Sequence, residues 1–174
     1  MDIARQWGRS SALLNDIIVA RGGRYFQFLQ PNQYVADSKP LGDEERRRAL
    51  HPGSPYRRSV EIGYPYMRAM GASLRRADLW FEDLTGLFAH DGRQLYVDSC
   101  CHLNAEGNAI LARAIAGAIA ARLAAGDKAL PLTPDAVDFG DSLFAAEELR
   151  RFTSNPADYN DGSADFIGVQ RRSR

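Results

Sequence analysis

The stretch "YVDSCCHLNAEGNAILARAIA", residues 96–116, decides most of what the sequence says about the fold of this 174-residue chain. It runs from a short apolar segment through a polar turn directly into a helix. Asn104 is a good N-cap for that helix and Gly126 ends it, which predicts a helix over residues 105–125. One apolar face is formed by Ile110, Leu111, Ala114, Ile115, Ala118, Ile119 and Leu123. A strand that leads into a capped helix is the repeating step of an α/β sheet.

Upstream of this stretch, helix and strand patterns alternate along the chain. The expected helices cover residues 3–21 and 57–76, and the expected strands cover residues 24–31, 79–84 and 94–98. Gly22 and Gly23 stop the first helix, Pro31 closes the first strand, and Pro65 is a point at which the second helix could break. The alternation favours an α/β fold with a short parallel sheet, but two or three strands are few for a complete domain.

Composition excludes several classes of function. The chain is 45% hydrophobic and 25% charged, and it carries 22 basic and 22 acidic residues, so no net field attracts nucleic acid. No apolar run reaches the roughly 18 residues of a membrane helix. The N-terminus lacks the apolar core of a secretory signal, so a cytoplasmic location is the default and the compartment stays open. Cys100 and Cys101 are adjacent and predict buried reduced thiols rather than a disulfide or a metal site.

Two segments lack regular patterns. Residues 32–56 form a long loop with one short charged helix candidate, "DEERRRAL", and a loop of this length suggests a lid. Within it, "QPN" at 30–32 and "SKP" at 38–40 either line a substrate cleft or reflect turn chemistry. After Gly126 the chain becomes rich in proline and small polar residues. We therefore divide it into a domain at residues 1–126 and an irregular C-terminal extension at residues 127–174.

The densest group of reactive side chains lies in the connection between the 94–98 strand and the following helix. Asp98 and His102 sit there, at the end of sheet strands where α/β proteins place their sites. A carboxylate beside a histidine holds the imidazole in one tautomer and makes it a usable general base. His51 and His90 lie in polar loops without such a context. Asp98 and His102 are the candidate catalytic residues, and we expect neither a metal nor a cofactor.

Here the chain resembles the SGNH, or GDSL, hydrolase family. The resemblance rests on the block "DSCCHLNAEGNAILARAIAGAIA" and, upstream, on "YFQFLQPNQYVADSKPLGDEE" and "ADLWFEDLTGLF". It covers about residues 1–125 and matches the C-terminal half of such a domain. It implies a partial flavodoxin-like three-layer sandwich and hydrolysis of a carboxylic ester, of a small molecule or a glycan, through an acyl-serine. His102 would be the base and Asp98 would orient it.

The sequence departs from the family pattern in two ways. The usual spacing is Asp-x-x-His, whereas three residues separate Asp98 from His102, so a bulged turn must absorb the extra residue. The family's serine nucleophile and oxyanion-hole residues should precede residue 24, where no segment holds them. We therefore expect the serine to come from sequence outside this chain, either in a longer natural chain or lost from a truncated copy.

Ser142, in "VDFGDSLF" at 137–144, offers a second source for the nucleophile. Its lead-in, "LTPDAVDF", is a poor central strand, so we favour chance resemblance, with Asp141 and Ser142 capping a short helix at about 143–152. Three alternatives stay open: an O-acyltransferase of the same family, a non-catalytic interaction module that pairs with a partner or with itself, and a permuted enzyme that uses Ser142.

Overall fold

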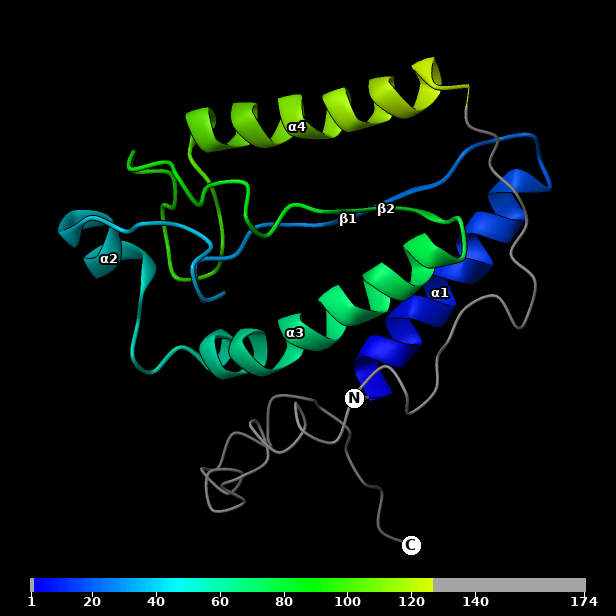
Figure 1. Ribbon diagram of the computed structural model, residues 1–174. Helices are drawn as coiled ribbons and strands as arrows, with labels where there is room; N and C mark the ends of the chain where they lie inside the picture. The colour runs from blue at the N-terminus through cyan, green and yellow to red at the C-terminus, as the bar shows by residue number, and fades with distance from the viewer. Residues whose placement is uncertain (1, 127–174) are drawn as a thin grey trace, which may run out of the picture. The chain divides into compact units, whose positions relative to one another are not determined.

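The computed structural model describes residues 2–126, as an α/β arrangement of four helices and two strands (Figure 1). The predicted helix and strand patterns are confirmed at four of the five positions named above and for the final helix. In chain order the elements are α1 (Asp2–Val19), β1 (Phe26–Leu29), α2 (Asp43–Ala49), α3 (Pro55–Arg76), β2 (Trp80–Asp83) and α4 (Ala105–Ala124). Residues 127–174, and with them the expected extension, its short helix and Ser142, lie outside the described residues.

The sheet consists of β1 and β2, which pair in parallel with Phe26 opposite Trp80 and Leu29 opposite Asp83. Because the two strands run in the same direction, the chain must cross from the end of one to the start of the other, and α3 lies in that crossover. Helices α1 and α3 pack together on one side of the strands, and α4 runs along the other side (Figure 1). The α/β class is therefore confirmed for the described part.

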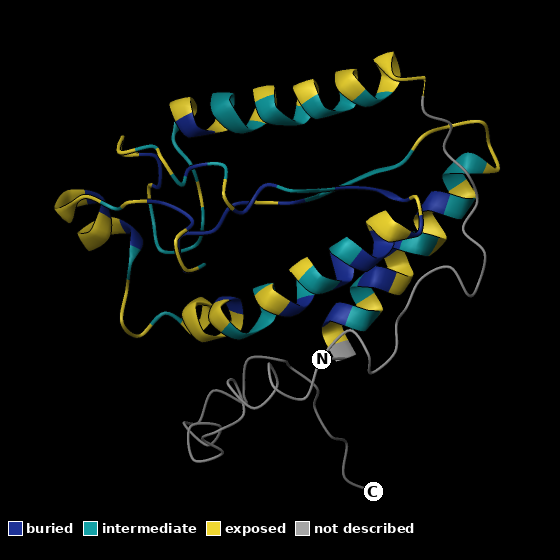
Figure 2. Ribbon diagram, in the orientation of Figure 1, coloured by how far each residue is buried: buried dark blue, intermediate teal, exposed yellow. Residues whose placement is uncertain are grey.

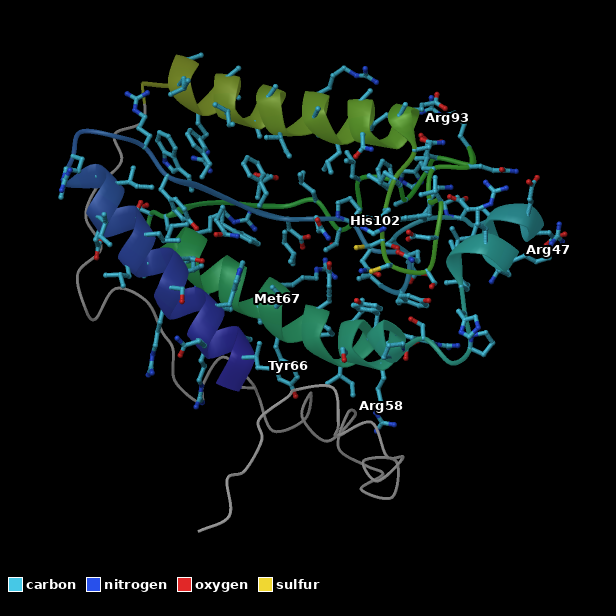
Figure 3. The ribbon with its side chains drawn as sticks, turned by 180° about the vertical axis from the view of Figure 1, so that it is seen from behind. Arg47, Arg58, Tyr66, Met67, Arg93 and His102 are labelled. Atoms are coloured by element: carbon cyan, nitrogen blue, oxygen red, sulfur yellow. The ribbon has the colours of Figure 1, made fainter. Side chains whose placement is uncertain are left out.

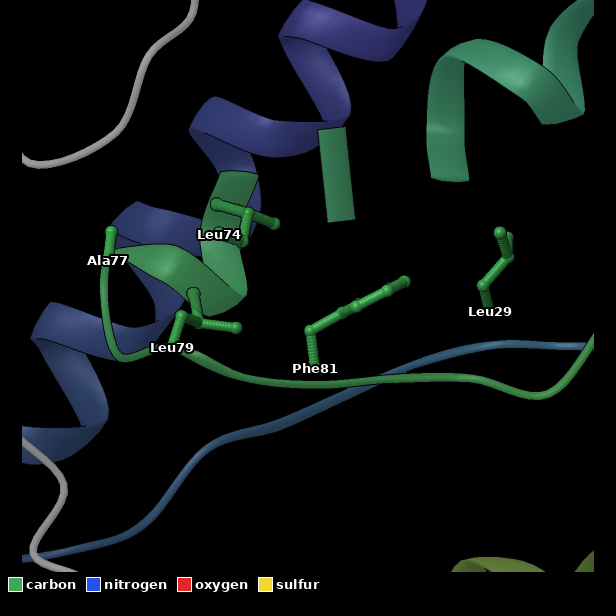
Figure 4. Close-up of a cluster of buried hydrophobic side chains, with 5 residues drawn as sticks. All are labelled: Leu29, Leu74, Ala77, Leu79 and Phe81. Carbon is green, nitrogen blue, oxygen red and sulfur yellow. The ribbon is translucent and has the colours of Figure 1, made fainter. Parts of the chain in front are cut away.

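The core between the strands and α3 is a cluster of five buried side chains (Figure 4): Leu29, Leu74, Ala77, Leu79 and Phe81. Trp7 of α1 packs edge-on against the Phe81 ring, with the ring centroids 6.1 Å apart. Gly71 lets α3 approach this ring, because a Cβ at that position would lie 2.1 Å from Phe81 Cζ. Through these contacts the helix layer of α1 and α3 packs on β2.

Helix α3 runs through Pro65 without a break, so the interruption considered at that residue does not occur. A proline removes one N–H donor and its ring crowds the preceding turn, so other contacts must hold the helix at this point. Tyr66, Met70 and Leu74 follow at four-residue intervals and are all buried. Their burial holds the helix on the sheet on the C-terminal side of the proline.

The third strand predicted at residues 94–98 is wrong for the described part of the chain. The segment forms only an isolated antiparallel bridge between Tyr96 and Leu103. The backbone N–H groups of Leu95 and Tyr96 both donate to Oε1 of Glu45, each at 2.8 Å. A side-chain carboxylate thus takes the donors that a neighbouring strand would otherwise use.

The first part of the 32–56 segment is packed into the molecule, whereas most of its residues after Lys39 are exposed. Asn32, Gln33, Ser38 and Lys39 are all buried. Asn32 makes a local turn, in which its Oδ1 accepts from the Tyr34 N–H at 3.0 Å and its carbonyl accepts from Ser38 Oγ at 2.8 Å. Turn chemistry therefore accounts for Asn32 and Ser38, and the charged helix expected within the segment is present as α2.

Candidate functional site

The Asp98–His102 turn is a tight reversal held by backbone hydrogen bonds. The Val97 N–H donates to the His102 carbonyl at 3.0 Å, and the Asn104 N–H donates to the Leu95 carbonyl at 2.8 Å. Within the turn, Cys101 has a φ of 64°, a left-handed conformation that is uncommon for any residue except glycine. The left-handed residue lies within this reversal, in which the Asp98 carboxylate meets the His102 ring.

The geometry of the pair is that of an oriented histidine. Nδ1 of His102 lies 2.6 Å from Oδ2 of Asp98. The other carboxylate oxygen, Oδ1, accepts from the backbone N–H of Cys100 at 2.8 Å and of His102 at 3.3 Å. Because an ionised carboxylate can only accept hydrogen bonds, the neutral ring carries its hydrogen on Nδ1. The lone pair of Nε2 is then free to accept a proton.

Electrostatics keep the carboxylate ionised. Partial burial acts to raise the pKa of Asp98, but the hydrogen bonds from the His102 ring and from the two backbone N–H groups outweigh it and lower the pKa below its ordinary value. The side chain of His102 is 68% exposed and that of Asp98 is 43% exposed. The ring, labelled in Figure 3, is therefore accessible to a partner from the solvent side.

The turn is anchored to the start of α4 by Asn104. Its Oδ1 accepts from the Gly107 N–H at 2.8 Å, which confirms the predicted N-cap. Its Nδ2 donates to the Gln94 carbonyl at 2.7 Å, so the same side chain ties the helix to the segment that enters the turn. The position of the Asp98–His102 pair is thus tied to the start of α4.

The two cysteines of the turn are free thiols and half-buried, so the expectation of buried thiols is corrected. Their position in an exposed reversal keeps both side chains near the surface. Burial is the largest influence on Cys101 and raises the pKa of its thiol, so Cys101 stays protonated at neutral pH and is a poor nucleophile. Its sulfur accepts from Gln30 Nε2 at 3.5 Å.

Sequence reasoning missed the buried polar residues beneath the turn. Lys39 and Glu45 form an ion pair, with Nζ 2.9 Å from Oε2 and both side chains wholly buried. Gln33, also buried, donates from Nε2 to the carbonyl of Asp98 at 3.1 Å. Glu45 belongs to the run "DEERRR", which reads as a solvated helix, and the sequence carries no signal that singles it out.

A cavity of about 340 Å³ lies between α4 and the sheet, toward the opposite end of the helix from the Asp98–His102 turn. Its walls include aromatic side chains of both strands and alanines near the C-terminal end of α4, together with the charged residues Glu82 and Arg122. Gly107 is the one buried residue of this helix. Figure 2 colours most of α4 as intermediate or exposed. The predicted apolar face is present, but it is only half-buried.

Within residues 2–126, no group of three or more His, Cys, Asp or Glu side chains is placed to hold a metal ion. By length and composition alone, α4 is the one described helix apolar enough to cross a membrane, which does not define a clear membrane span. Comparisons with protein-family models, curated proteins and solved structures gave no match.

Proposed function

We propose that residues 2–126 form the Asp–His part of a carboxylic ester hydrolase of the SGNH type, built on a flavodoxin-like sandwich. One observation carries the proposal: the 2.6 Å contact between His102 Nδ1 and Asp98 Oδ2, in a turn that precedes a capped helix. The contact orients the ring and leaves Nε2 as a base on an exposed surface. The reaction type, ester hydrolysis, is inferred from the resemblance of the surrounding block to that family.

In the proposed mechanism His102 acts on protons and Asp98 holds it in place. Nε2 accepts the proton of a serine hydroxyl as the oxygen attacks the ester carbonyl, and the protonated ring then donates to the leaving alcohol. The same nitrogen next deprotonates a water molecule that hydrolyses the acyl-serine. Asp98 stabilises the imidazolium formed in both steps. The serine is Ser142, or belongs to another segment or chain that completes the site.

A transferase of the same kind would use the same two residues. If a sugar hydroxyl in place of water attacks the acyl-serine, Nε2 of His102 takes its proton and an O-acyl sugar is released. The substrate would then be a glycan, whereas a hydrolase acts on a small-molecule or glycan ester. Product analysis in the presence of an acceptor alcohol separates the two reactions.

The reactivity of His102 can be tested without knowing the serine. An oriented imidazole hydrolyses an activated ester such as p-nitrophenyl acetate, and the chain has three histidines. We expect His102→Gln to remove most of the hydrolysis by the purified chain, and His51→Gln and His90→Gln, at exposed positions, to leave it. Equal losses from all three variants would show that His102 has no special reactivity and would count against the proposal.

The source of the serine is tested with a fluorophosphonate probe and intact-mass measurement. A single adduct that disappears in both Ser142→Ala and His102→Gln identifies a self-contained enzyme. An adduct that survives in His102→Gln contradicts the role given to this histidine. The absence of any adduct means that this chain alone is not a serine hydrolase, and it favours a nucleophile from elsewhere or the second candidate below.

A second candidate function is that of an interaction module. Within residues 2–126 each of the two strands is hydrogen-bonded on one side only, and open strand edges are templates for pairing with another chain. Helix α4, on the face of the sheet, is apolar and largely unburied. Sedimentation equilibrium tests this candidate: a monomer at all concentrations argues against self-association, and a dimer supports it.

A further inference from the structure

We infer that Gln33, Lys39 and Glu45 form a buried polar support that positions the Asp98–His102 pair. The inference rests on the proposed function, because it assigns these residues a role through that pair. None of the three contacts His102. Each binds the backbone of the 91–98 segment instead, and that segment carries Asp98 into the turn.

Glu45 and Lys39 hold the segment before the turn. Oε1 of Glu45 accepts from the backbone N–H groups of both Leu95 and Tyr96 at 2.8 Å. Lys39 Nζ pairs with Oε2 of the same carboxylate and donates to the Asp91 carbonyl at 2.8 Å. One buried ion pair therefore fixes backbone groups at two points of the path to Asp98.

Gln33 reaches the catalytic residue itself. Its Nε2 donates to the Asp98 carbonyl at 3.1 Å and to the Ala49 carbonyl at 3.2 Å. A single amide group thus joins the end of α2 to the backbone of the residue that holds the histidine. Because Gln33 is buried, water cannot readily replace these two bonds.

The need for a support follows from the shape of the segment. In a parallel sheet, a strand before a site is fixed by the hydrogen bonds of its neighbours. Residues 94–98 have no such ladder and make only the Tyr96–Leu103 bridge. The turn fixes Asp98 relative to His102 through its own hydrogen bonds, and the support holds the backbone that carries Asp98 into the turn.

The test uses Gln33→Met, which keeps an unbranched side chain of similar length and removes the donor. Two properties are measured on the full chain by NMR: the midpoint of the Asp98 carboxyl titration, and the ring nitrogen that carries the hydrogen in neutral His102. We expect the Asp98 pKa to rise toward its ordinary value of about 3.9 and the Nδ1–H tautomer to lose population. The Asp91 carboxyl, whose pKa is held at about 2 by Arg93, is the internal control and should not move.

The ion pair is tested with two double variants. They differ in whether residue 45 keeps an oxygen that can accept from the backbone N–H groups of Leu95 and Tyr96. Glu45→Gln combined with Lys39→Met removes both charges and the Lys39 bond to the Asp91 carbonyl, but it keeps an oxygen to accept from Leu95 and Tyr96. We therefore expect it to lose only part of the Nδ1–H tautomer population. Glu45→Leu with Lys39→Met removes the acceptor as well, and we expect the Nδ1–H tautomer to be lost. If that variant fails to fold, Gln33→Met decides alone.

The positioning role is overturned if Asp98 and His102 behave in Gln33→Met as they do in the parent chain. A shift of Asp91 together with Asp98 would also overturn it, since it would show a general loosening of the structure. Neither readout depends on ester hydrolysis. A failed esterase assay with an intact tautomer shift therefore contradicts the proposed function and leaves the positioning role standing.

Discussion

The two ends of α4 are built in opposite ways. At its N-terminal end, the irregular segments 32–49 and 91–104 satisfy one another's backbone groups through buried side chains. At its C-terminal end, regular strands and a regular helix face each other across an aromatic-lined cavity. We call the N-terminal end, with its buried hydrogen bonds, the closed end. We call the C-terminal end, which borders the cavity, the open end.

This difference shows that regular secondary structure and completeness of packing are separate properties. A parallel sheet is ordinarily covered on both faces, and a two-stranded sheet is marginal alone. The described sheet is covered well by α1 and α3 and loosely by α4. The Asp98–His102 pair, by contrast, has its orienting contacts within residues 2–126. The orientation of this pair is therefore set within the described residues, whereas α4 leaves a cavity on the sheet.

The largest effect is expected from breaking the closed end. Glu45→Leu leaves Lys39 as a buried unpaired charge and two backbone donors without their acceptor. We expect the free energy of unfolding to fall by about 3–5 kcal/mol. Chemical denaturation of the purified variant measures it. Glu61→Leu, which removes an exposed ion pair with Arg57, is the control and should cost about 0.3–0.5 kcal/mol. Equal losses would contradict the buried pairing.

The covered face of the sheet is tested by two glycines of α3. Gly71→Ala places a methyl group into the Phe81 ring, and we expect a loss of about 1–3 kcal/mol from overpacking. Gly63→Ala meets no atom within 4 Å and should stabilise the helix by about 0.5–1 kcal/mol. Thermal unfolding of the two variants compares them directly. If both stabilise the protein, α3 does not approach the sheet as described.

The pH dependence of stability sharpens the account of Asp98. Because its folded pKa is lowered, its ionised form contributes stability above the unfolded pKa of about 3.9, and this is lost as the pH falls through the folded pKa. The stability difference between the parent chain and Asp98→Asn should therefore shrink below about pH 4. For Asp91→Asn the loss should extend to about pH 2. Urea titrations across this range measure the two stability differences. If the difference for Asp98→Asn does not change with pH, the hydrogen bonds assigned to the Asp98 carboxylate are contradicted.

The smallest effect on stability is expected at the open end. Leu123 of α4 is 44% exposed, so Leu123→Gln should change the free energy of unfolding by no more than about 0.5 kcal/mol. If α4 is an association surface, the same variant should weaken self-association in sedimentation. A large loss of monomer stability would show that α4 is packed more tightly than its exposure indicates.

Local patterns predicted the regular elements well. The strand patterns around Phe26 and Trp80 and the Asn104 cap each depend on neighbours in sequence, and each was found as expected. The helix predicted at the N-terminus is present as α1, but Ile3 and Ile17 of its apolar spacing are exposed. The Asp98–His102 contact was also predicted, because the two residues lie four positions apart. What the spacing could not give was the left-handed Cys101 that closes the turn.

The errors concern partners that are distant in sequence. Residues 94–98 have the composition of a strand, but Glu45, some fifty positions earlier, takes their donors. The 32–56 segment reads as a loose loop because its polar residues are indistinguishable from solvated ones until their partners are known. Burial of Lys39 and Glu45 is a property of the folded chain, and charge runs in a sequence favour exposure.

The tautomer of His102 tests the central claim most directly. Nitrogen-15 NMR at about pH 8, where an unperturbed imidazole is neutral, identifies the ring nitrogen that carries the hydrogen. The account predicts hydrogen on Nδ1 and a bare Nε2 in the parent chain, with this preference lost in Asp98→Asn. Hydrogen on Nε2 in both proteins would contradict it, because the histidine would then have no oriented base to offer.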